Sequence, residues 1–309
     1  MIVFGGNASG ELLNKVCAVL NIPLGKALFS KFPDGETKVE VEENVRGKDT
    51  FIIQSISPPA NDNLMELLLM IDALRRASAR RVTAVVPYLG YARQDRKHKG
   101  RVPISARLVA DLIETAGADR VLTVDLHASQ IQGFFKIPVD HLPGRIAFEN
   151  GFQENLKNIV VISPDAGSIQ RAGPLANELN VPLVIIDKRR MDERKITVRT
   201  VIGDVKGKTA LLADDIIATG GTMVGDAEAL IREGAKKIIA CATHGVFSPE
   251  SKDTLDNSDI EKIYLTDSVK SVFPLPERAV YEHSVAPFLA EGIRRIHGNL
   301  SVGEIIEHT

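Results

Sequence analysis

The sequence has almost no excess of charge of either sign. Its 38 lysine and arginine residues are balanced by 40 aspartate and glutamate residues, which leaves a formal net charge of −2 at pH 7. A general nucleic-acid binder needs a basic surface that neutralises phosphates, and this composition does not provide one. We therefore expect no nucleic acid among the partners.

Cysteine is scarce, and no hydrophobic run is long. Cys17 and Cys241 are far apart in apolar surroundings, which predicts reduced core residues in a reducing compartment and excludes a disulfide framework. The first residues lack the basic segment of a secretory signal peptide. No apolar run reaches the ~18 residues of a membrane span. Together these absences predict a cytoplasmic protein with no membrane contact.

The chain does have the apolar residues needed for a large core. Of its 309 residues, 44% are hydrophobic, which argues against disorder and gives length for two ordinary domains or one large one. Short β-branched runs alternate with longer amphipathic patterns, which is typical of parallel sheets covered by helices on both faces. Residues 195–205 alternate between apolar and polar instead, which predicts an antiparallel hairpin arm or edge strand. The other strands are expected at 50–56, 82–88, 120–125, 159–163, 182–187, 210–215 and 237–244, and two helices at 63–78 and 104–117.

One strand–loop–helix unit occurs twice. Residues 47–55 (GKDTFIIQS) align with 207–215 (GKTALLADD). The segment after the following helix is also similar in the two copies, at 75–89 and at 231–246. A repeat about half a chain apart indicates a duplicated α/β domain.

The boundary between the two copies is expected in the proline-containing stretch 138–145. This predicts an N-terminal domain over 1–145 and a C-terminal domain over 146–309.

In the second copy the strand ends in two adjacent acids. Asp214 and Asp215 stand where the first copy has Gln54 and Ser55. Neighbouring carboxylates repel each other and are costly to desolvate, so their place at a strand end predicts a ligand.

The loop after the acid pair is suited to an anion. Glycines let backbone N–H groups approach a phosphate, the following helix N-terminus favours negative charge, and two threonines can donate hydroxyls. The acids can accept from two neighbouring hydroxyls, and a cis-diol beside a phosphate is a ribose phosphate. The alternative, a solvated turn with an N-capping threonine, does not explain why acid pair, glycine pair and strand end coincide. The loop residues are Ala218, Thr219, Gly220, Gly221 and Thr222.

Two other loops carry side chains that suit a nucleotide. Arg93 can bridge phosphates with both arms of its guanidinium, and Gln94 can meet an adenine or ribose edge, although a solvated charged loop is the alternative. Phe32 can stack on a purine while Asp34 and Glu36 orient its polar edge. By itself, that stretch is better explained as a Pro-Asp-Gly turn.

Three further positions lie at or beyond strand ends. His127 follows a strand with Asp125 two residues before it, which suits a Mg²⁺-bound phosphate through a direct or water-mediated contact, although a lone histidine is more often structural. Asp165 precedes a helix and could anchor a metal or a ribose. Residues 187–190 (DKRR) begin a charged stretch, which by composition alone predicts a solvated hairpin.

Taken together, these motifs resemble those of the ribose-phosphate pyrophosphokinase (PRPP synthetase) family, and the loop at 214–222 also resembles that of type I phosphoribosyltransferases. The resemblance runs along nearly the whole chain. The matching stretches are 32–36 (FPDGE), 43–47 (ENVRG), 61–68 (NDNLMELL), 87–96 (PYLGYARQDR), 121–135 (VLTVDLHASQIQGFF), 163–167 (SPDAG), 187–190 (DKRR) and 214–222 (DDIIATGGT).

The resemblance implies a fold, a reaction and an assembly. The fold would be α/β, with two duplicated phosphoribosyltransferase type I-like domains, each a mainly parallel sheet flanked by helices. The first domain would bind ATP and mediate oligomerisation, the second would bind ribose 5-phosphate, and the last helix would pack back on the first. With Mg²⁺, ATP and ribose 5-phosphate would give 5-phosphoribosyl 1-diphosphate and AMP. The protein would be a homo-oligomer built from dimers, often a hexamer.

The resemblance also implies a role for particular residues. Lys188 and Arg190 would be the catalytic cations on a mobile loop, and His127 and Asp165 would serve the metal. The ATP site would contain Phe32, Asp34, Glu36, Arg93, Gln94, Asp95 and His127, the first three borrowed from a neighbouring subunit. The ribose 5-phosphate site would contain Asp214, Asp215, Ala218, Thr219, Gly220, Gly221 and Thr222.

Two positions depart from the family pattern, and two alternatives stay open. Ala218 and Ser168 replace residues that are common in relatives, which puts single contacts in doubt. A nucleobase phosphoribosyltransferase would share the 214–222 loop but would not need the duplicated domain. A non-catalytic regulatory paralogue would be expected to lose parts of the loop or the cations, and all are present here.

Overall fold

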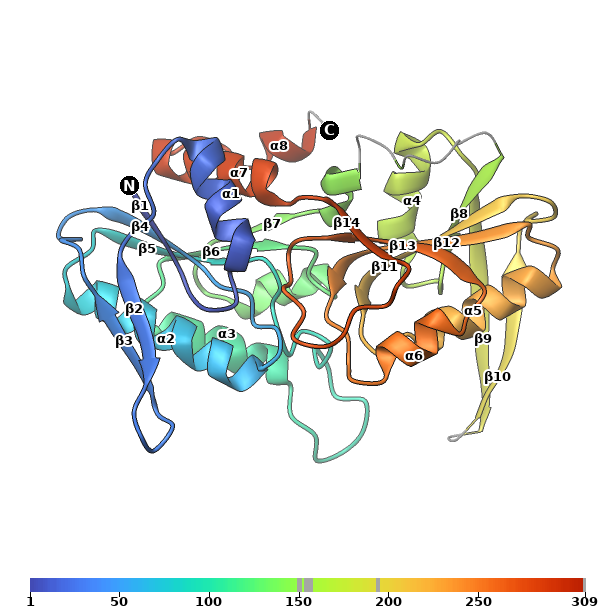
Figure 1. Ribbon diagram of the computed structural model, residues 1–309, viewed down its shortest axis with the longest axis horizontal. Coiled ribbons are helices and arrows are strands. Elements are labelled where there is room, and N and C mark those ends of the chain that lie inside the picture. The colour runs from blue at the N-terminus through green and yellow to red at the C-terminus, as the bar shows by residue number, and fades with distance from the viewer. Residues whose placement is uncertain (149–151, 153–157, 193–194, 308–309) are drawn as a thin grey trace. The chain divides into compact units, whose positions relative to one another are not determined.

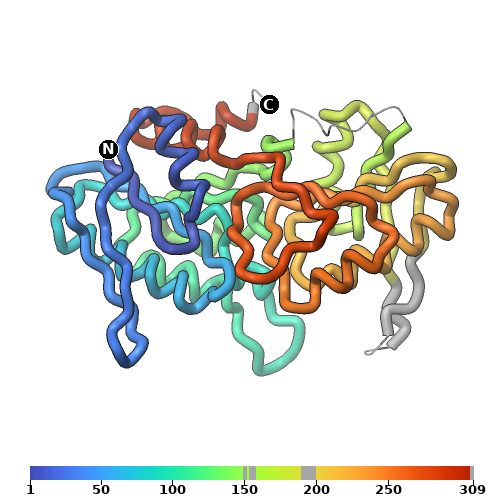
Figure 2. Tube along the Cα trace, viewed as in Figure 1, coloured from blue at the N-terminus to red at the C-terminus, as the bar shows by residue number. Residues whose placement is uncertain are grey.

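The chain divides into two units in the computed structural model, which describes residues 1–148, 152, 158–192 and 195–307, with the side chains of 189–199 and 307 left aside (Figure 1). Unit 1 contains Met1–Gly144, Ser268–Val272 and the chain from Ser284 onward. Unit 2 contains Arg145–Asp267 and Phe273–His283. Figure 2 follows the trace as it leaves unit 1, passes through unit 2 and returns to unit 1 near the C-terminus.

A five-stranded parallel sheet forms the centre of unit 1. Its order is β1 (Ile2–Gly5), β4 (Asp49–Ile53), β5 (Arg81–Val86), β6 (Arg120–Val124) and β7 (Val139–Leu142). Every residue of β4 is buried, because helices cover both faces of the sheet, and this explains why Phe51, Ile52 and Ile53 are apolar without alternation.

The helices of unit 1 form a layer on each side of its sheet (Figure 1). On one side lie α2 (Ala60–Arg76) and α3 (Ser105–Ala116), whose apolar faces share a core with the strands. On the other side α1 (Gly10–Leu20) packs against α7 (Ala286–Gly298), which is followed by α8 (Glu304–Glu307). Two short 3₁₀ helices, Ser129–Phe134 and Gly144–Phe148, precede and follow β7.

Unit 2 is built on a seven-stranded sheet. Its order is β10 (Lys195–Ile202), β9 (Leu183–Asp192), β8 (Ile159–Ser163), β11 (Thr209–Ile217), β12 (Lys237–Gly245), β13 (Ile260–Thr266) and β14 (Ala279–His283). All neighbours are parallel except β9 and β10. Helix α4 (Ile169–Glu178) covers one face, and α5 (Gly221–Arg232) and α6 (Ser251–Asp256) cover the other, so separate apolar cores form on the two faces.

The predicted α/β class and the parallel strands are confirmed. Residues 195–202 form an antiparallel edge strand, as their alternation indicated. Strand β9 continues to Asp192, five residues beyond the predicted end at 187, because β10 pairs with its charged second half. Both cysteines, Cys17 and Cys241, are buried thiols.

The duplication is visible in backbone hydrogen bonds. The N–H of Gly47 donates to the Ser78 oxygen at 2.8 Å, and that of Gly207 donates to the Gly234 oxygen at 2.7 Å. Gly47 and Gly207 have φ of 68° and 69°, a left-handed conformation that favours glycine. The order β1–α1–β4–α2–β5–α3–β6 thus recurs as β8–α4–β11–α5–β12–α6–β13.

Each copy also inserts a hairpin between its first two core strands. In unit 1, β2 (Ala27–Lys31) and β3 (Thr37–Val41) form a separate two-stranded sheet whose apolar residues pack on the core. In unit 2 the equivalent hairpin is β9–β10, which joins the main sheet through β8. The FPDGE motif and the DKRR motif therefore lie on equivalent hairpins of the two copies.

A buried ion pair fastens the C-terminal helix to unit 1. Asp49 and Arg81 begin neighbouring strands and form a side-chain pair, and Arg81 also donates to the Ile296 oxygen at 2.7 Å. The Nδ1 atom of His297 lies 2.7 Å from Asp49 Oδ2.

No helix within the described ranges is both long enough and apolar enough to cross a bilayer.

We expect Asp49→Asn to destabilise unit 1 in a pH-dependent way. Burial acts to raise the pKa of Asp49, but the hydrogen bonds from Arg81 and His297 outweigh it, so the pKa lies below its ordinary value. Stability from this carboxylate is present above the ordinary value of about 3.9 and is lost as pH falls toward the lower folded-state value. At pH 7 the substitution should lower the free energy of unfolding by roughly 1–3 kcal/mol. Urea denaturation at pH 7 and near pH 3 checks this, and an equal loss at both pH values would contradict it.

Candidate active site

The acid pair lies where β11 continues beyond its neighbour β8. β11 pairs with β8 only as far as Leu212, but with β12 as far as Ile217. Strand β8 ends before Pro164, which has no N–H to extend the ladder. Asp214 and Asp215 therefore stand on a part of β11 that has a strand on one side and an opening on the other.

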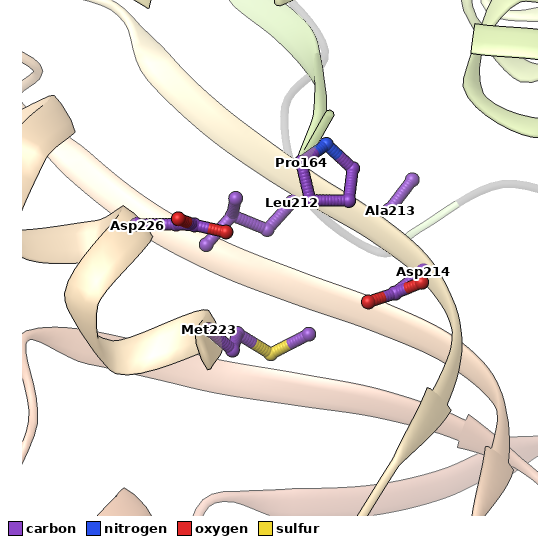
Figure 3. Close-up of a pocket in the computed structure, with 6 residues that line it drawn as sticks. All are labelled: Pro164, Leu212, Ala213, Asp214, Met223 and Asp226. Atoms are coloured by element: carbon purple, nitrogen blue, oxygen red, sulfur yellow. The ribbon is translucent and has the colours of Figure 1, made fainter. Parts of the chain in front are cut away.

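A pocket occupies this opening (Figure 3). It is lined by Pro164, Leu212, Ala213, Asp214, Met223 and Asp226. Figure 3 shows the carboxylates of Asp214 and Asp226 on opposite sides, with the Met223 side chain between the strand and the helix. The lining is thus mostly apolar, with one carboxylate from β11 and one from α5.

Arg171 offsets part of the repulsion between the two acids. Its Nη2 atom lies 3.0 Å from Asp215 Oδ1 and 3.4 Å from Asp214 Oδ1. Burial and then the charge of Asp215 raise the pKa of Asp214 well above its ordinary value, while Arg171 acts in the opposite direction. Ionising both acids in the folded protein therefore costs stability.

A short chain of hydrogen bonds links Arg171 to the end of β8. The Arg171 guanidinium donates to Ser168 Oγ at 3.1 Å, and the Ser168 hydroxyl donates to Asp165 Oδ1 at 3.0 Å. The Ser168 N–H donates to the same Asp165 oxygen at 2.8 Å. Ser168, which departs from the family pattern, therefore connects the exposed Asp165 with the acid pair.

Arg171 was not predicted from the sequence. It lies in the first turn of α4, three residues after Ser168 and six after Asp165. The sequence does contain a signal for this residue. Arg171 is a cation in the first turn of the helix that follows β8, and β8 pairs with the strand that carries the two acids.

The loop from Ala218 to Thr222 presents a helix N-terminus to solvent. Gly220 has φ 81° and is the N-cap of α5, and no side chain caps this helix. A Cβ at Gly220 would lie 2.7 Å from Leu255 Cγ, so the position requires glycine. At Gly221 a Cβ would meet only Thr219 Oγ1, at 3.9 Å, so an anion can approach the backbone there. Together with the exposed Thr219 and Thr222, this geometry suits a phosphate.

The predicted cation Lys188 is paired with a buried acid. Its Nζ lies 2.8 Å from Oδ2 of Asp226, whose side chain is 1% exposed, while that of Lys188 is 22% exposed. Lys188 belongs to strand β9, opposite Arg199 of β10, where the sequence reading expected a loop. Arg190 is also in β9, but its side chain lies outside the described part of the chain.

Asp226 was not predicted from the sequence either. It lies four residues after Thr222 on α5, so the two residues share one face of the helix. An acid on the buried face of an amphipathic helix was the signal for it.

In unit 1 the predicted nucleotide-binding loops follow neighbouring strands. Residues 93–95 follow β5 and His127 follows β6, and because these strands are parallel, both loops leave the same edge of the sheet. Arg93 and Gln94 are exposed, and the Gln94 side-chain oxygen accepts from the Ser105 hydroxyl at the start of α3. The structure thus brings these two loops to one edge.

The FPDGE motif forms the tip of the β2–β3 hairpin. Gly35, at φ 94°, donates its N–H to the Phe32 oxygen, and the Glu36 N–H donates to Asp34 Oδ1 at 3.1 Å. The Phe32 side chain is 47% exposed. In Figure 1 the tip of this hairpin lies apart from the loop between β5 and α3, so one copy of unit 1 does not bring these two predicted sets together.

A mainly parallel sheet with an acid pair near the carboxyl end of a central strand, followed by an uncapped glycine turn, is the arrangement of a phosphoribosyltransferase-type domain. A family model for the phosphoribosyl transferase domain accordingly matches residues 143–276. A second model, for the N-terminal domain of ribose phosphate pyrophosphokinase, matches residues 1–117. The chain belongs to the ribose-phosphate pyrophosphokinase family.

Comparison with individual proteins agrees over nearly the full length. The chain is 49% identical to a ribose-phosphate pyrophosphokinase of Clostridium tetani, over 99% of this chain and 97% of that one. It is 51% identical to one from Thermotoga maritima, over 99% and 98%. The crystal structure of phosphoribosylpyrophosphate synthetase from Mycobacterium smegmatis matches with a TM-score of 0.88 at 43% identity, over 96% of this chain and 99% of that one.

We expect Asp214→Asn to make the ligand-free protein more stable at pH 8. Because the folded-state pKa of Asp214 is raised, its contribution to stability is present at low pH and is lost as pH rises through that value. The asparagine variant does not suffer this loss, so its Tm should exceed that of the parent at pH 8 and match it near pH 4. Thermal unfolding at both pH values checks this. A variant with a lower Tm at pH 8 would contradict the electrostatic account of the acid pair.

Proposed function

We propose that this chain is a ribose-phosphate diphosphokinase. It transfers the β,γ-diphosphoryl group of ATP to the 1-hydroxyl of ribose 5-phosphate, giving 5-phosphoribosyl 1-diphosphate and AMP. The observation that carries this proposal is the acid pair in β11, followed six residues later by the uncapped N-terminus of α5. Family membership over both units supports the same reaction.

The sugar would be held at two points of one strand–loop–helix unit. Asp214 and Asp215 accept hydrogen bonds from the vicinal hydroxyls, and the 218–222 loop binds the 5-phosphate through backbone N–H groups and threonine hydroxyls. Because both contacts belong to one strand–loop–helix segment of unit 2, they would together fix the orientation of the 1-hydroxyl.

The nucleotide would be bound by unit 1 and acted on by the cations of β9. Arg93, Gln94, Asp95 and His127 lie in the loops after β5 and β6. Lys188 and Arg190 would stabilise charge on the transferred group.

A homo-oligomer would complete the nucleotide site. Phe32, Asp34 and Glu36 would come from a neighbouring copy, which agrees with the distance of their hairpin tip from the other loops of unit 1.

The donors present suit Mg²⁺ that arrives with the nucleotide. Among the described residues, no three His, Cys, Asp or Glu side chains are close enough together to hold a metal. Mg²⁺ usually keeps waters and phosphate ligands and takes only one or two carboxylates from the protein. Asp165 is exposed just after β8 and His127 lies after β6, and the side-chain chemistry of either residue suits one coordination position of such an ion. When bound, the ion neutralises charge on the phosphate oxygens.

The chemistry asks the protein mainly for position and charge. The 1-hydroxyl oxygen attacks the β-phosphorus, the bond from that phosphorus to the α-phosphate oxygen breaks, and AMP leaves. A nucleobase phosphoribosyltransferase would use the same sugar site but would not need unit 1. The match of unit 1 to its own family model therefore favours the kinase.

We expect the purified protein with Mg²⁺, ATP and ribose 5-phosphate to release AMP only when the sugar is present. Chromatographic measurement of AMP checks this. AMP release that needs an added partner subunit would favour the regulatory paralogue, and release of diphosphate dependent on a nucleobase would favour the transferase.

We expect Lys188→Ala to lower turnover by about 10²–10³-fold and to leave ribose 5-phosphate affinity within about twofold. The lysine acts on charge in the transition state, while the sugar is held by β11 and α5. Steady-state AMP release and calorimetry measure the two quantities. Lys252→Ala, which removes a cation of α6 paired with Asp256, is the matched control and should keep full turnover. Near-normal turnover in Lys188→Ala would refute its role.

A further inference from the structure

Asp226 is a buried acid that the reaction as described so far does not use. Its side chain is 1% exposed, on the face of α5 that also carries Thr222 and Met223. On one side its carboxylate lines the pocket opposite Asp214 (Figure 3), and on another it binds the Lys188 ammonium at 2.8 Å. It therefore connects the pocket beside Asp214 with the cation of β9.

The pair is costly to break from either side. An ionised carboxylate as buried as Asp226 is strongly destabilised when its cationic partner leaves. If the Lys188 ammonium had to break its ion pair with Asp226 in order to contact a phosphate, every turnover would include the free-energy cost of breaking that pair. The energetics therefore favour a pair that stays together while the nucleotide is bound.

The Lys188 ammonium can donate hydrogen bonds to Asp226 and to a phosphate at the same time. An ammonium has three N–H donors, and the 2.8 Å contact with Asp226 uses one of them. The Lys188 side chain remains 22% exposed, so a ligand can approach the group from the solvent side. A free lysine side chain would lose much rotamer freedom on meeting a phosphate, whereas one already held has less to lose.

We propose that Asp226 is a positioning residue that holds the Lys188 ammonium at the edge of the pocket, with its remaining donors directed toward the diphosphoryl group. This inference rests on the proposed function. Asp226 acts through Lys188 and does not contact the reacting atoms. It sets where the positive charge lies before the nucleotide binds.

The test is Asp226→Asn, which keeps the size of the side chain and removes its charge. We expect kcat for AMP release to fall at least tenfold, because Lys188 is no longer held in place. The KM for ribose 5-phosphate should stay within twofold, since Asp214, Asp215 and the 218–222 loop are untouched. Unchanged or higher kcat would overturn the proposal, because it would mean that Asp226 does not help Lys188 or restrains it.

A double-mutant cycle separates positioning from a general structural effect. If Asp226 acts through Lys188, adding Asp226→Asn to Lys188→Ala should change kcat less than twofold further. Independent, multiplying losses would overturn the proposal. Should Lys188→Ala fail to fold, Lys188→Gln replaces it in both backgrounds, because it removes the charge and keeps an amide that can donate to the side chain at position 226.

Asp49→Asn is the matched control for burial. The Asp49–Arg81 pair has the same exposure, 1% for the acid and 22% for the cation, and lies in β4 and β5 of unit 1, outside the proposed machinery. We expect this variant to lose stability but to keep kcat within twofold. An equal loss of kcat in both variants would show that breaking any buried pair suffices, and would overturn the positioning role.

The two proposals fail in different ways. If the parent protein releases no AMP with ATP and ribose 5-phosphate, the proposed function is wrong. If the parent is active and Asp226→Asn is equally active, only the role of Asp226 is wrong.

Discussion

The site depends on two adjacent carboxylates that the fold holds beside an opening in a sheet. Strand β8 stops at a proline, β11 continues, and Asp214 and Asp215 are left with a strand on one side only. Arg171 reduces their repulsion, yet the pKa of Asp214 stays raised by burial and by its neighbour. In the proposed complex, a ligand with two neighbouring hydroxyls would donate to these acceptors and so offset part of the cost of holding the two carboxylates together.

The duplication shows how one architecture serves two purposes. In unit 1 the positions equivalent to the acid pair are Gln54 and Ser55, both buried and both tied to their own unit. Gln54 Nε2 donates to Glu66 at 2.9 Å, and Ser55 Oγ donates to the Ser268 oxygen at 2.6 Å. The equivalent positions are therefore structural in one copy and belong to the proposed ligand site in the other. The inserted hairpins, by contrast, carry proposed functional side chains in both copies.

Much of the fold could be predicted because its signals are local. Buried parallel strands read as continuous apolar runs, the edge strand at 195–202 reads as alternation, and the repeat is visible as aligned strand ends. The 218–222 loop could be recognised because glycine and acid pairs are rare together at a strand end. Arg171 and Asp226 could not be placed from sequence, because their partners depend on how α4 and α5 lie across the sheet. The length of β9 was also underestimated, since pairing with β10 extends a charged segment that composition assigns to a loop.

The most direct measurement is a crystal structure with ribose 5-phosphate bound. The account predicts that the vicinal hydroxyls lie within hydrogen-bond distance of Asp214 and Asp215, with the 5-phosphate at the N-terminus of α5 between Ala218 and Thr222. A sugar phosphate ordered elsewhere on the protein, with this loop and the acid pair empty, would contradict it.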